Sequence, residues 1–153
     1  MRYALERIVS GGQTGADRAA LDWAIVHGIN HGGWCPRGRR AEDGRIGRQY
    51  VLRETPSRDY AQRTRWNARD SDATLIVSRS AELSGGSAYT ARSAKRLGRP
   101  WRHVHPGADS VAALVDFLQQ HRVRTLNVAG PRGSTDPAIY EYVRGVLERL
   151  VQS

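Results

Sequence analysis

The chain has 153 residues, a single cysteine and a formal net charge of +9. This length predicts one ordinary domain, and the single cysteine excludes an internal disulfide framework. No apolar run approaches the roughly 18 residues of a membrane span, and the first ten residues lack the apolar core of a signal peptide. We therefore expect one cytoplasmic domain over residues 1–153, without membrane association.

Short apolar segments alternate with longer segments of helical periodicity. Runs such as "TLIVS" and "TLNVA" are typical of strands that are covered on both faces. The alternation predicts an α/β, Rossmann-like three-layer sandwich, in which a mainly parallel sheet of about five strands carries helices on both faces. In chain order the expected elements are strand Arg7–Ser10, helix Gly15–His27, strand Gly28–Gly32, helix Asp59–Asp70, strand Ala73–Ser78, helix Ser87–Leu97, strand Trp101–His105, helix Ser110–Gln120, strand Thr125–Ala129 and helix Pro137–Val151.

Two of these helices carry clear start signals. Asp109 or Ser110 is a suitable N-cap for the helix over 110–120. Pro137 follows Asp136, and proline is favoured at the first position of a helix because its missing N–H has no partner there in any case.

The connection over residues 34–58 breaks the alternation. It shows no helical or strand period, contains Pro36 and Pro56, and is rich in glycine and arginine. Loops of this length in compact domains are commonly functional or disordered. Because the segment mixes both charges with Trp34 and Tyr50, we expect an ordered flap, with disorder as the alternative.

Three expected strand-to-helix turns contain glycine: "SGGQTGAD", "LSGGSAYT" and "AGPRGSTD". In a parallel sheet such turns lie together at the carboxyl edge of the strands, where ligands bind. Glycine lets a backbone approach an anion closely, and a helix N-terminus offers free N–H groups. Each turn alone is equally explained by the need to turn. Three on one edge predict an anion-binding site.

The turns exclude two common nucleotide sites. The first turn has the spacing G-G-x-x-G rather than G-x-G-x-x-G, and no G-K-[ST] follows any strand, so neither a standard NAD site nor a P-loop is expected. Arg37, Arg39 and Arg40 of the flap are candidates to grip a second phosphate, since arginine makes forked contacts with phosphate. Trp34 is a candidate to stack on a planar ring or, alternatively, to pack the flap onto the domain.

With "SGGQTGADRAALD", "HGGWCPRGRRAEDG", "TRWNARDSDATLIVS", "LSGGSAYT" and "NVAGPRGS", nearly the whole chain resembles the molybdenum carrier family, which is also described as circularly permuted YpsA-like. That family lies within the lysine-decarboxylase-like Rossmann group. The resemblance implies binding of molybdenum cofactor, a pterin bearing a phosphate, and self-association into a dimer or tetramer. It implies as lining residues Gly11, Gly12, Gln13, Thr14, Gly15, Asp17, Gly85, Gly86, Ser87, Gly130, Pro131 and Arg132.

A second resemblance leaves an enzymatic alternative open. "RDSDATLIVS" and Arg63 resemble part of the phosphoribohydrolase motif, but Ala91 and Arg92 stand where those enzymes carry glutamates. A nucleotide hydrolase would therefore use Arg63 with Asp17 or Glu42 as its catalytic residues. A nucleotide sensor, which only binds its ligand, is a further alternative. Asp17 is equally suited to stabilise a helix N-terminus, and Glu42 to an ion pair within the flap. We expect a binding protein rather than an enzyme.

Three further features bear on function: the net charge, a pair of histidines and the single cysteine. The charge of +9 permits nucleic-acid binding, although no long basic run marks a dedicated patch. His103 and His105 lie two residues apart on one expected strand, but no third ligand accompanies them, so no metal site is expected. Cys35 is a candidate to touch molybdenum or to act as a thiol, or else to be a small buried residue.

Overall fold

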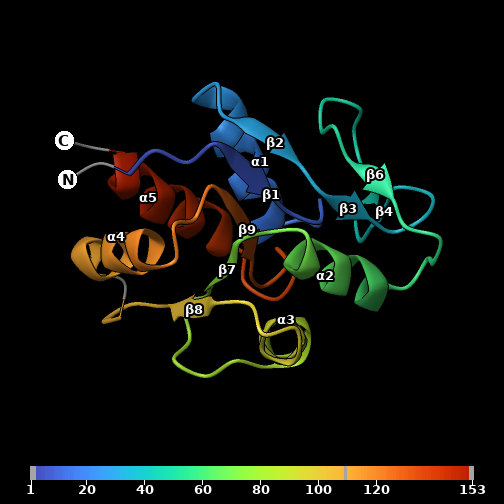
Figure 1. Cartoon of the computed structure of the whole chain (residues 1–153). Helices are drawn as coiled ribbons and strands as arrows, with labels where there is room; N and C mark the ends of the chain where they lie inside the picture. Colours follow the sequence, from blue (N-terminus) through green and yellow to red (C-terminus); the bar gives the residue numbers. More distant parts are fainter. Residues whose placement is uncertain (1–2, 109, 152–153) are drawn as a thin grey trace.

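A five-stranded parallel sheet forms the centre of the computed structural model, which describes residues 3–108 and 110–151 (Figure 1). Its order is β2-β1-β9-β7-β8, and all four pairings are parallel. The predicted Rossmann-like α/β architecture is therefore confirmed. The strands of the sheet are β1 Arg7–Val9, β2 Asn30–Gly32, β7 Ala73–Val77, β8 Trp101–Val104 and β9 Thr125–Ala129.

Five helices cover the two faces of this sheet. The helices α1 (Ala16–Val26), α4 (Val111–Gln120) and α5 (Ile139–Val151) pack on one face, whereas α2 (Tyr60–Arg69) and α3 (Gly85–Arg96) pack together on the other (Figure 1). Over residues 3–108 and 110–151, none of the helices combines the length and apolar composition that a bilayer crossing requires.

The helix ends differ from prediction by one or two residues. The helix α3 begins at Gly85, two residues early, so its glycines belong to its first turn. The helix α5 begins at Ile139, after Pro137. Ser110 caps α4 by accepting a hydrogen bond from the Ala113 N–H, while Asp109, the other candidate cap, lies outside the described residues.

The strand order explains why distant segments meet. The last strand in the sequence, β9, lies between β1 and β7, with Ile8 paired to Leu126 and Leu75 paired to Val128. Since all these strands run in the same direction, the turns that follow β1, β9 and β7 lie next to one another at the carboxyl edge. The sheet thus brings together the three glycine-containing turns of the sequence.

The segment over residues 34–58 carries four strands of two residues each. Strands β3 (Trp34–Cys35) and β6 (Arg53–Glu54) form a parallel pair, and β4 (Arg40–Ala41) and β5 (Gly44–Arg45) form an antiparallel hairpin. A buried apolar cluster fixes the segment on α1; it consists of Leu21, Cys35, Ala41, Ile46, Tyr50 and Leu52. We call this segment the flap.

Candidate functional site

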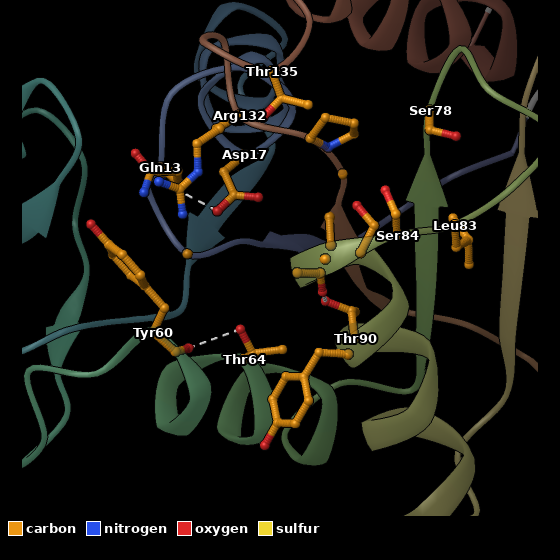
Figure 2. Close-up of a pocket in the computed structure, with 18 of the residues that line it drawn as sticks. Gln13, Asp17, Tyr60, Thr64, Ser78, Leu83, Ser84, Thr90, Arg132 and Thr135 are labelled. Carbon is orange, nitrogen blue, oxygen red and sulfur yellow. Dashed lines mark hydrogen bonds between the residues drawn. The ribbon is translucent and has the colours of Figure 1, made fainter.

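A cavity of about 850 Å³ opens at the carboxyl ends of β1, β9 and β7 (Figure 2). This volume is within the range of roughly 300–1,000 Å³ that is typical of small-molecule sites. Its walls are the β1–α1, β7–α3 and β9–α5 turns together with one face of α2 and the first turns of α3. The predicted site at this edge of the sheet therefore coincides with a cavity large enough for a heterocyclic ligand.

The α2 wall is a row of polar residues at helical spacing. Tyr60, Arg63, Thr64 and Asn67 follow one another at i, i+3, i+4 and i+7, so they share one face of the helix, and all four line the cavity. Asn67 also has a structural task, because its Nδ2 donates to Trp34 O at 2.9 Å and its Oδ1 accepts from Trp34 N at 2.7 Å. The other three present a phenol, a guanidinium and a hydroxyl to the cavity.

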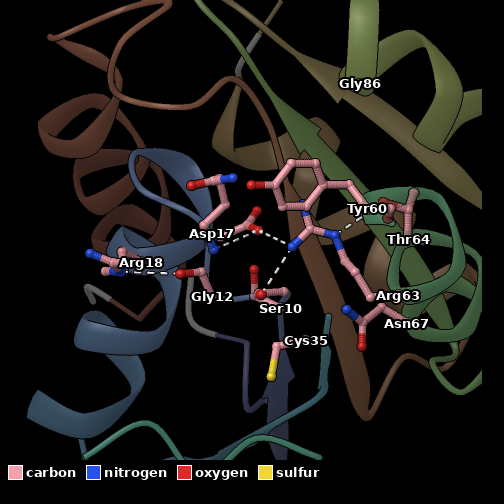
Figure 3. Close-up of polar contacts among 12 residues, drawn as sticks. Ser10, Gly12, Asp17, Arg18, Cys35, Tyr60, Arg63, Thr64, Asn67 and Gly86 are labelled. Carbon is pink, nitrogen blue, oxygen red and sulfur yellow. Dashed lines mark hydrogen bonds and ion pairs between the residues drawn. The ribbon is translucent and has the colours of Figure 1, made fainter. Parts of the chain in front are cut away.

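Asp17 and Arg63 form a buried ion pair in the wall of the cavity (Figure 3). Arg63 Nη1 lies 3.6 Å from Asp17 Oδ2 and donates to Gly11 O at 3.0 Å, and Asp17 Oδ2 accepts from Gln13 N at 3.2 Å. Burial raises the pKa of the Asp17 carboxyl, and the Arg63 guanidinium opposes that rise. The pair accordingly places a carboxyl with a raised pKa beside a fixed cation.

Gly11 is required by the close approach of Arg63. A Cβ at position 11 would overlap Arg63 Nη1 and lie 2.9 Å from Arg63 Cζ. The glycine in the first turn thus makes room for a buried arginine from α2, and the same arginine then holds the Gly11 carbonyl. The turn after β1 is built around this contact.

The N-terminus of α3 forms the opposite wall. Ser84 is the N-cap residue, and Gly85, Gly86 and Ser87 occupy the first turn and line the cavity. A Cβ at Gly85 or at Gly86 would meet no atom within 4 Å, so the space in front of this turn is open. Free N–H groups and the positive end of the helix dipole favour an anion here.

The third turn is joined to the first by hydrogen bonds. Ala16 N donates to Pro131 O at 3.1 Å, and Gly133 N donates to Thr14 Oγ1 at 3.0 Å. Gly130, Pro131 and Arg132 of this turn line the cavity, as the resemblance implied. The Arg132 guanidinium lies 5.2 Å from the centre of the Tyr60 ring, across the mouth between this turn and α2.

Six of the predicted site residues lie outside the cavity. Gly12, Thr14 and Gly15 shape the turns instead: Gly12 and Gly15 adopt positive φ, and Thr14 accepts the bond from Gly133. Trp34 packs on Trp66 and Arg53 and donates to Asp70, which matches its alternative role as a packing residue. Arg37 is exposed on the flap.

Arg39 also differs from its expected role. Its guanidinium donates to the carbonyl oxygens of Ile46, Gly47, Tyr50 and Leu52 at 2.7–3.3 Å and so closes the flap on itself. Neighbouring Arg40 lies over the Tyr60 ring at 4.7 Å, away from any carboxylate partner among the described residues. Arg39 therefore stabilises the folded flap, and none of the three flap arginines lines the cavity.

The remaining candidates are placed by specific contacts. Glu42 lies outside the cavity, accepts from Ser134 Oγ at 2.9 Å, and has a lowered pKa because of that bond. Cys35 is buried in the flap cluster. The rings of His103 and His105 lie 4.8 Å apart, but within the described part of the chain no three His, Cys, Asp or Glu residues are grouped for a metal.

Sequence reasoning missed several lining residues. Tyr60, Thr64 and Asn67 were detectable, because their spacing with Arg63 marks one face of α2. Asn127 was detectable as a buried polar residue within the apolar strand "TLNVA". Ser78, whose Oγ lies 2.6 Å from His103 Nε2, carries no such signal because a serine after a strand is common.

Comparisons with known proteins agree with this architecture. No curated protein matches the chain. A crystal structure of a protein from Syntrophus aciditrophicus SB, named "Putative molybdenum carrier protein", is similar to it with a TM-score of 0.94 and 45% sequence identity, covering 99% of this chain and 98% of that one. The model of the circularly permutated YpsA SLOG family matches residues 8–151. The chain therefore belongs to the circularly permutated YpsA SLOG family.

Proposed function

We propose that this chain binds a phosphorylated heterocyclic compound in the cavity, and that its cargo is molybdenum cofactor, which it binds or carries. The observation that carries the proposal is the meeting of three strand-to-helix turns around one cavity of about 850 Å³. The name of the 45% identical relative supports the molybdenum part. A nucleotide or nucleotide-derived ligand is the alternative occupant of the same cavity.

The lining residues offer hydrogen-bond donors and acceptors that a phosphorylated heterocycle can use. The first turn of α3 is open and offers N–H donors to oxygen atoms of the ligand. Tyr60 offers its phenol hydroxyl, and the Asp17 carboxyl is an acceptor for ring amines. Both charged and ring-like parts of the ligand would therefore find partners in one cavity.

Recognition of molybdenum cofactor would rely on the organic part of the molecule. Within the described part of the chain no cysteine or histidine lines the cavity, and Cys35 is buried away from it. The phosphate and the pterin ring are then the groups that the protein contacts. This mode would let a carrier release its cargo without breaking a metal–ligand bond.

We expect molybdenum cofactor to stabilise the protein in a thermal-shift assay run beside nucleoside monophosphates and ADP-ribose. A ligand at one hundred times its dissociation constant adds about 2.7 kcal/mol to the free energy of unfolding. Gly86→Asp places a carboxylate in the open space at the start of α3 and should abolish the shift. Gly145→Asp, the same change at an open helical position in α5 outside the cavity, is the matched control.

Stabilisation by nucleotides but not by molybdenum cofactor would contradict the carrier proposal and leave a nucleotide-binding protein. If none of these ligands stabilises the protein, both the molybdenum cofactor proposal and the nucleotide alternative are contradicted. Equal loss in Gly86→Asp and Gly145→Asp would show that the ligand binds elsewhere or that charge acts at long range.

The Asp17–Arg63 pair favours a second candidate, a nucleotide hydrolase. Ala91 is buried and Arg92 carries the opposite charge, so neither replaces the missing glutamates. Asp17 lines the cavity, and burial raises its pKa, which is the direction that a proton-donating carboxyl group needs. Release of free base from nucleoside monophosphates, lost in a folded Asp17→Asn variant, is the expected result for this candidate. No release across a broad panel would exclude it.

A further inference from the structure

The side-chain amide of Gln13 is fixed in one orientation. Gln13 is only 5% exposed, and its Oε1 accepts two backbone N–H groups, from Thr14 at 3.0 Å and from Glu42 at 2.9 Å. Only the oxygen of an amide can accept such bonds, so the NH₂ group must occupy the other position. One of the two anchors comes from the first turn and the other from the flap.

The NH₂ group of Gln13 has no partner. Gln13 Nε2 is buried and forms no hydrogen bond within the described part of the chain, although Gln13 lines the cavity. Buried donors are nearly always satisfied, and an unsatisfied one is costly. The other two such atoms, Trp23 Nε1 and Arg102 Nε, belong to residues that do not line the cavity. Gln13 Nε2 is therefore an unpaired hydrogen-bond donor that belongs to a residue of the cavity wall.

Arg132 supplies a second free donor at the same end of the cavity. Within the described residues its guanidinium forms no hydrogen bond or ion pair, and it rests over the Tyr60 ring. Its turn is bonded to the turn of Gln13 through Pro131 and Gly133. Figure 2 shows Gln13 and Arg132 together beside Asp17, at the end of the cavity away from Ser84 and Leu83.

We propose that Gln13 Nε2 and the Arg132 guanidinium jointly hold an anionic oxygen of the ligand, of the phosphate class. The Arg132 guanidinium forms no hydrogen bond or ion pair among the described residues, so it is free to turn from Tyr60 toward the ligand. The Asp17 carboxylate nearby is paired with Arg63, and Glu42, whose pKa the charge of Arg132 helps to lower, forms no ion pair with Arg132 within the described residues. This proposal deepens the proposed function and rests on it. It places the phosphate at this end of the cavity, which leaves the N–H donors of the α3 N-terminus for other oxygen atoms of the ligand.

The flap determines what Gln13 can recognise. Because Glu42 N holds Oε1, the amide cannot flip to present its oxygen to the cavity without losing that bond and the one to Thr14. At its own position the Gln13 amide therefore favours an acceptor oxygen over a donor such as an amine. A ligand that offers no acceptor would leave the buried NH₂ group of Gln13 unpaired, and this cost is the source of the selectivity.

Gln13→Glu tests the donor directly. A glutamate keeps one oxygen for the Thr14 and Glu42 N–H groups but replaces the NH₂ group by a second oxygen, which repels an anion. We expect the affinity for inorganic phosphate, measured by calorimetry, to fall about tenfold or more, as for loss of a hydrogen bond to a charged group. Arg132→Gln should lower the affinity in the same direction.

Two variants separate the donor from the added charge. Gln62→Glu makes the same change on α2 outside the cavity, where Gln62 accepts from Ser57 N at 2.8 Å, and should leave phosphate affinity unchanged. Leu83→Asp adds a negative charge to the cavity wall at the end away from Gln13 and Arg132. If Leu83→Asp weakens phosphate binding as much as Gln13→Glu does, general electrostatics explains the loss and the proposal is overturned.

A measurement on the unmodified protein does not depend on how the variants fold. The side-chain NH₂ signals of Gln13 in a ¹H–¹⁵N NMR spectrum should shift as inorganic phosphate is added and saturate with the calorimetric affinity. Unmoved signals, or signals that shift with an unphosphorylated pterin and not with phosphate, would overturn the anion site. Molybdenum cofactor that still stabilises the protein in that case would leave the proposed function standing; a phosphate-induced shift without cofactor binding would leave only the anion site.

Discussion

Replacing Gly15 by alanine is expected to lower the free energy of unfolding by more than about 4 kcal/mol, the range reached only when a substitution meets a specific structural obstacle. Gly15 precedes α1 with φ of 82° and ψ of −124°, a conformation that is essentially restricted to glycine. A Cβ there would lie 2.6 Å from Pro131 O and 2.7 Å from Gly133 N. Since both are backbone atoms, the clash is relieved only by separating two turns of the cavity.

Gly145→Ala is the matched control for Gly15→Ala. Gly145 lies inside α5, and a Cβ on it would meet no atom within 4 Å. Alanine is favoured over glycine in a helix interior by about 1 kcal/mol, so this variant should be more stable than the natural protein. Chemical denaturation of both variants measures the difference. A Gly15→Ala variant within 1 kcal/mol of the natural protein, on the scale where surface changes fall, would contradict the packing of the two turns.

The sheet was predictable from the sequence because its signals are local. A run such as "TLIVS" is apolar and β-branched, and β7 is buried along its entire length as that composition predicts. Ser110 was identifiable as a cap from residue type and position alone. The α3 start was placed two residues late because Gly85 and Gly86 have low helix propensity, whereas the N-terminal turn tolerates them in front of an open cavity.

The internal structure of the flap was not predictable in this way. Strands of two residues cannot show a period, and their pairing joins distant positions such as Trp34 and Arg53. Arg39 illustrates the difficulty: a cluster of arginines indicates an anion site, yet this guanidinium is used by four carbonyl groups that approach only in the folded flap. No property of the neighbouring sequence distinguishes these two uses.

The parts of the candidate site that are formed by backbone turns were predictable from the sequence. The parts that are formed by side chains were less predictable. The glycine-containing turns Gly85–Gly86 and Gly130–Pro131 line the cavity as expected, because strand order brings them to one edge. Tyr60 and Thr64 escaped notice because polar residues on one helix face ordinarily indicate solvent. Arg63 of the same helix face is paired with the buried Asp17 of the first turn, and only the fold reveals that pairing.

Arg63→Met is expected to lower the free energy of unfolding by about 3 kcal/mol at neutral pH, as when one partner of a buried ion pair is removed. Methionine retains an apolar chain of similar reach but leaves Asp17 without its cation and Gly11 O without its donor. Arg65→Met is the control, since Arg65 is exposed on the same helix and contacts Tyr89 OH. Its effect should remain within about 0.5 kcal/mol.

The pH dependence identifies Asp17 as the origin of the loss. Burial already raises the pKa of Asp17 in the folded protein, and removing Arg63 raises it further. A group with a raised folded-state pKa stabilises the fold fully when protonated, below its unfolded pKa, and loses that contribution as pH rises through the folded pKa. The difference in stability between the natural protein and Arg63→Met should therefore widen as pH rises and narrow in acid.

The double variant Arg63→Met/Asp17→Asn completes the cycle. With no ionisable group at position 17, it should recover part of the lost stability at neutral pH, and its stability should no longer share the pH dependence of Arg63→Met. Urea denaturation at several pH values provides both quantities. A loss that is constant with pH and not recovered by Asp17→Asn would assign the stabilising role of Arg63 to its bond with Gly11 O instead. In that case the cavity wall would depend on the shape of the first turn rather than on the buried charge pair.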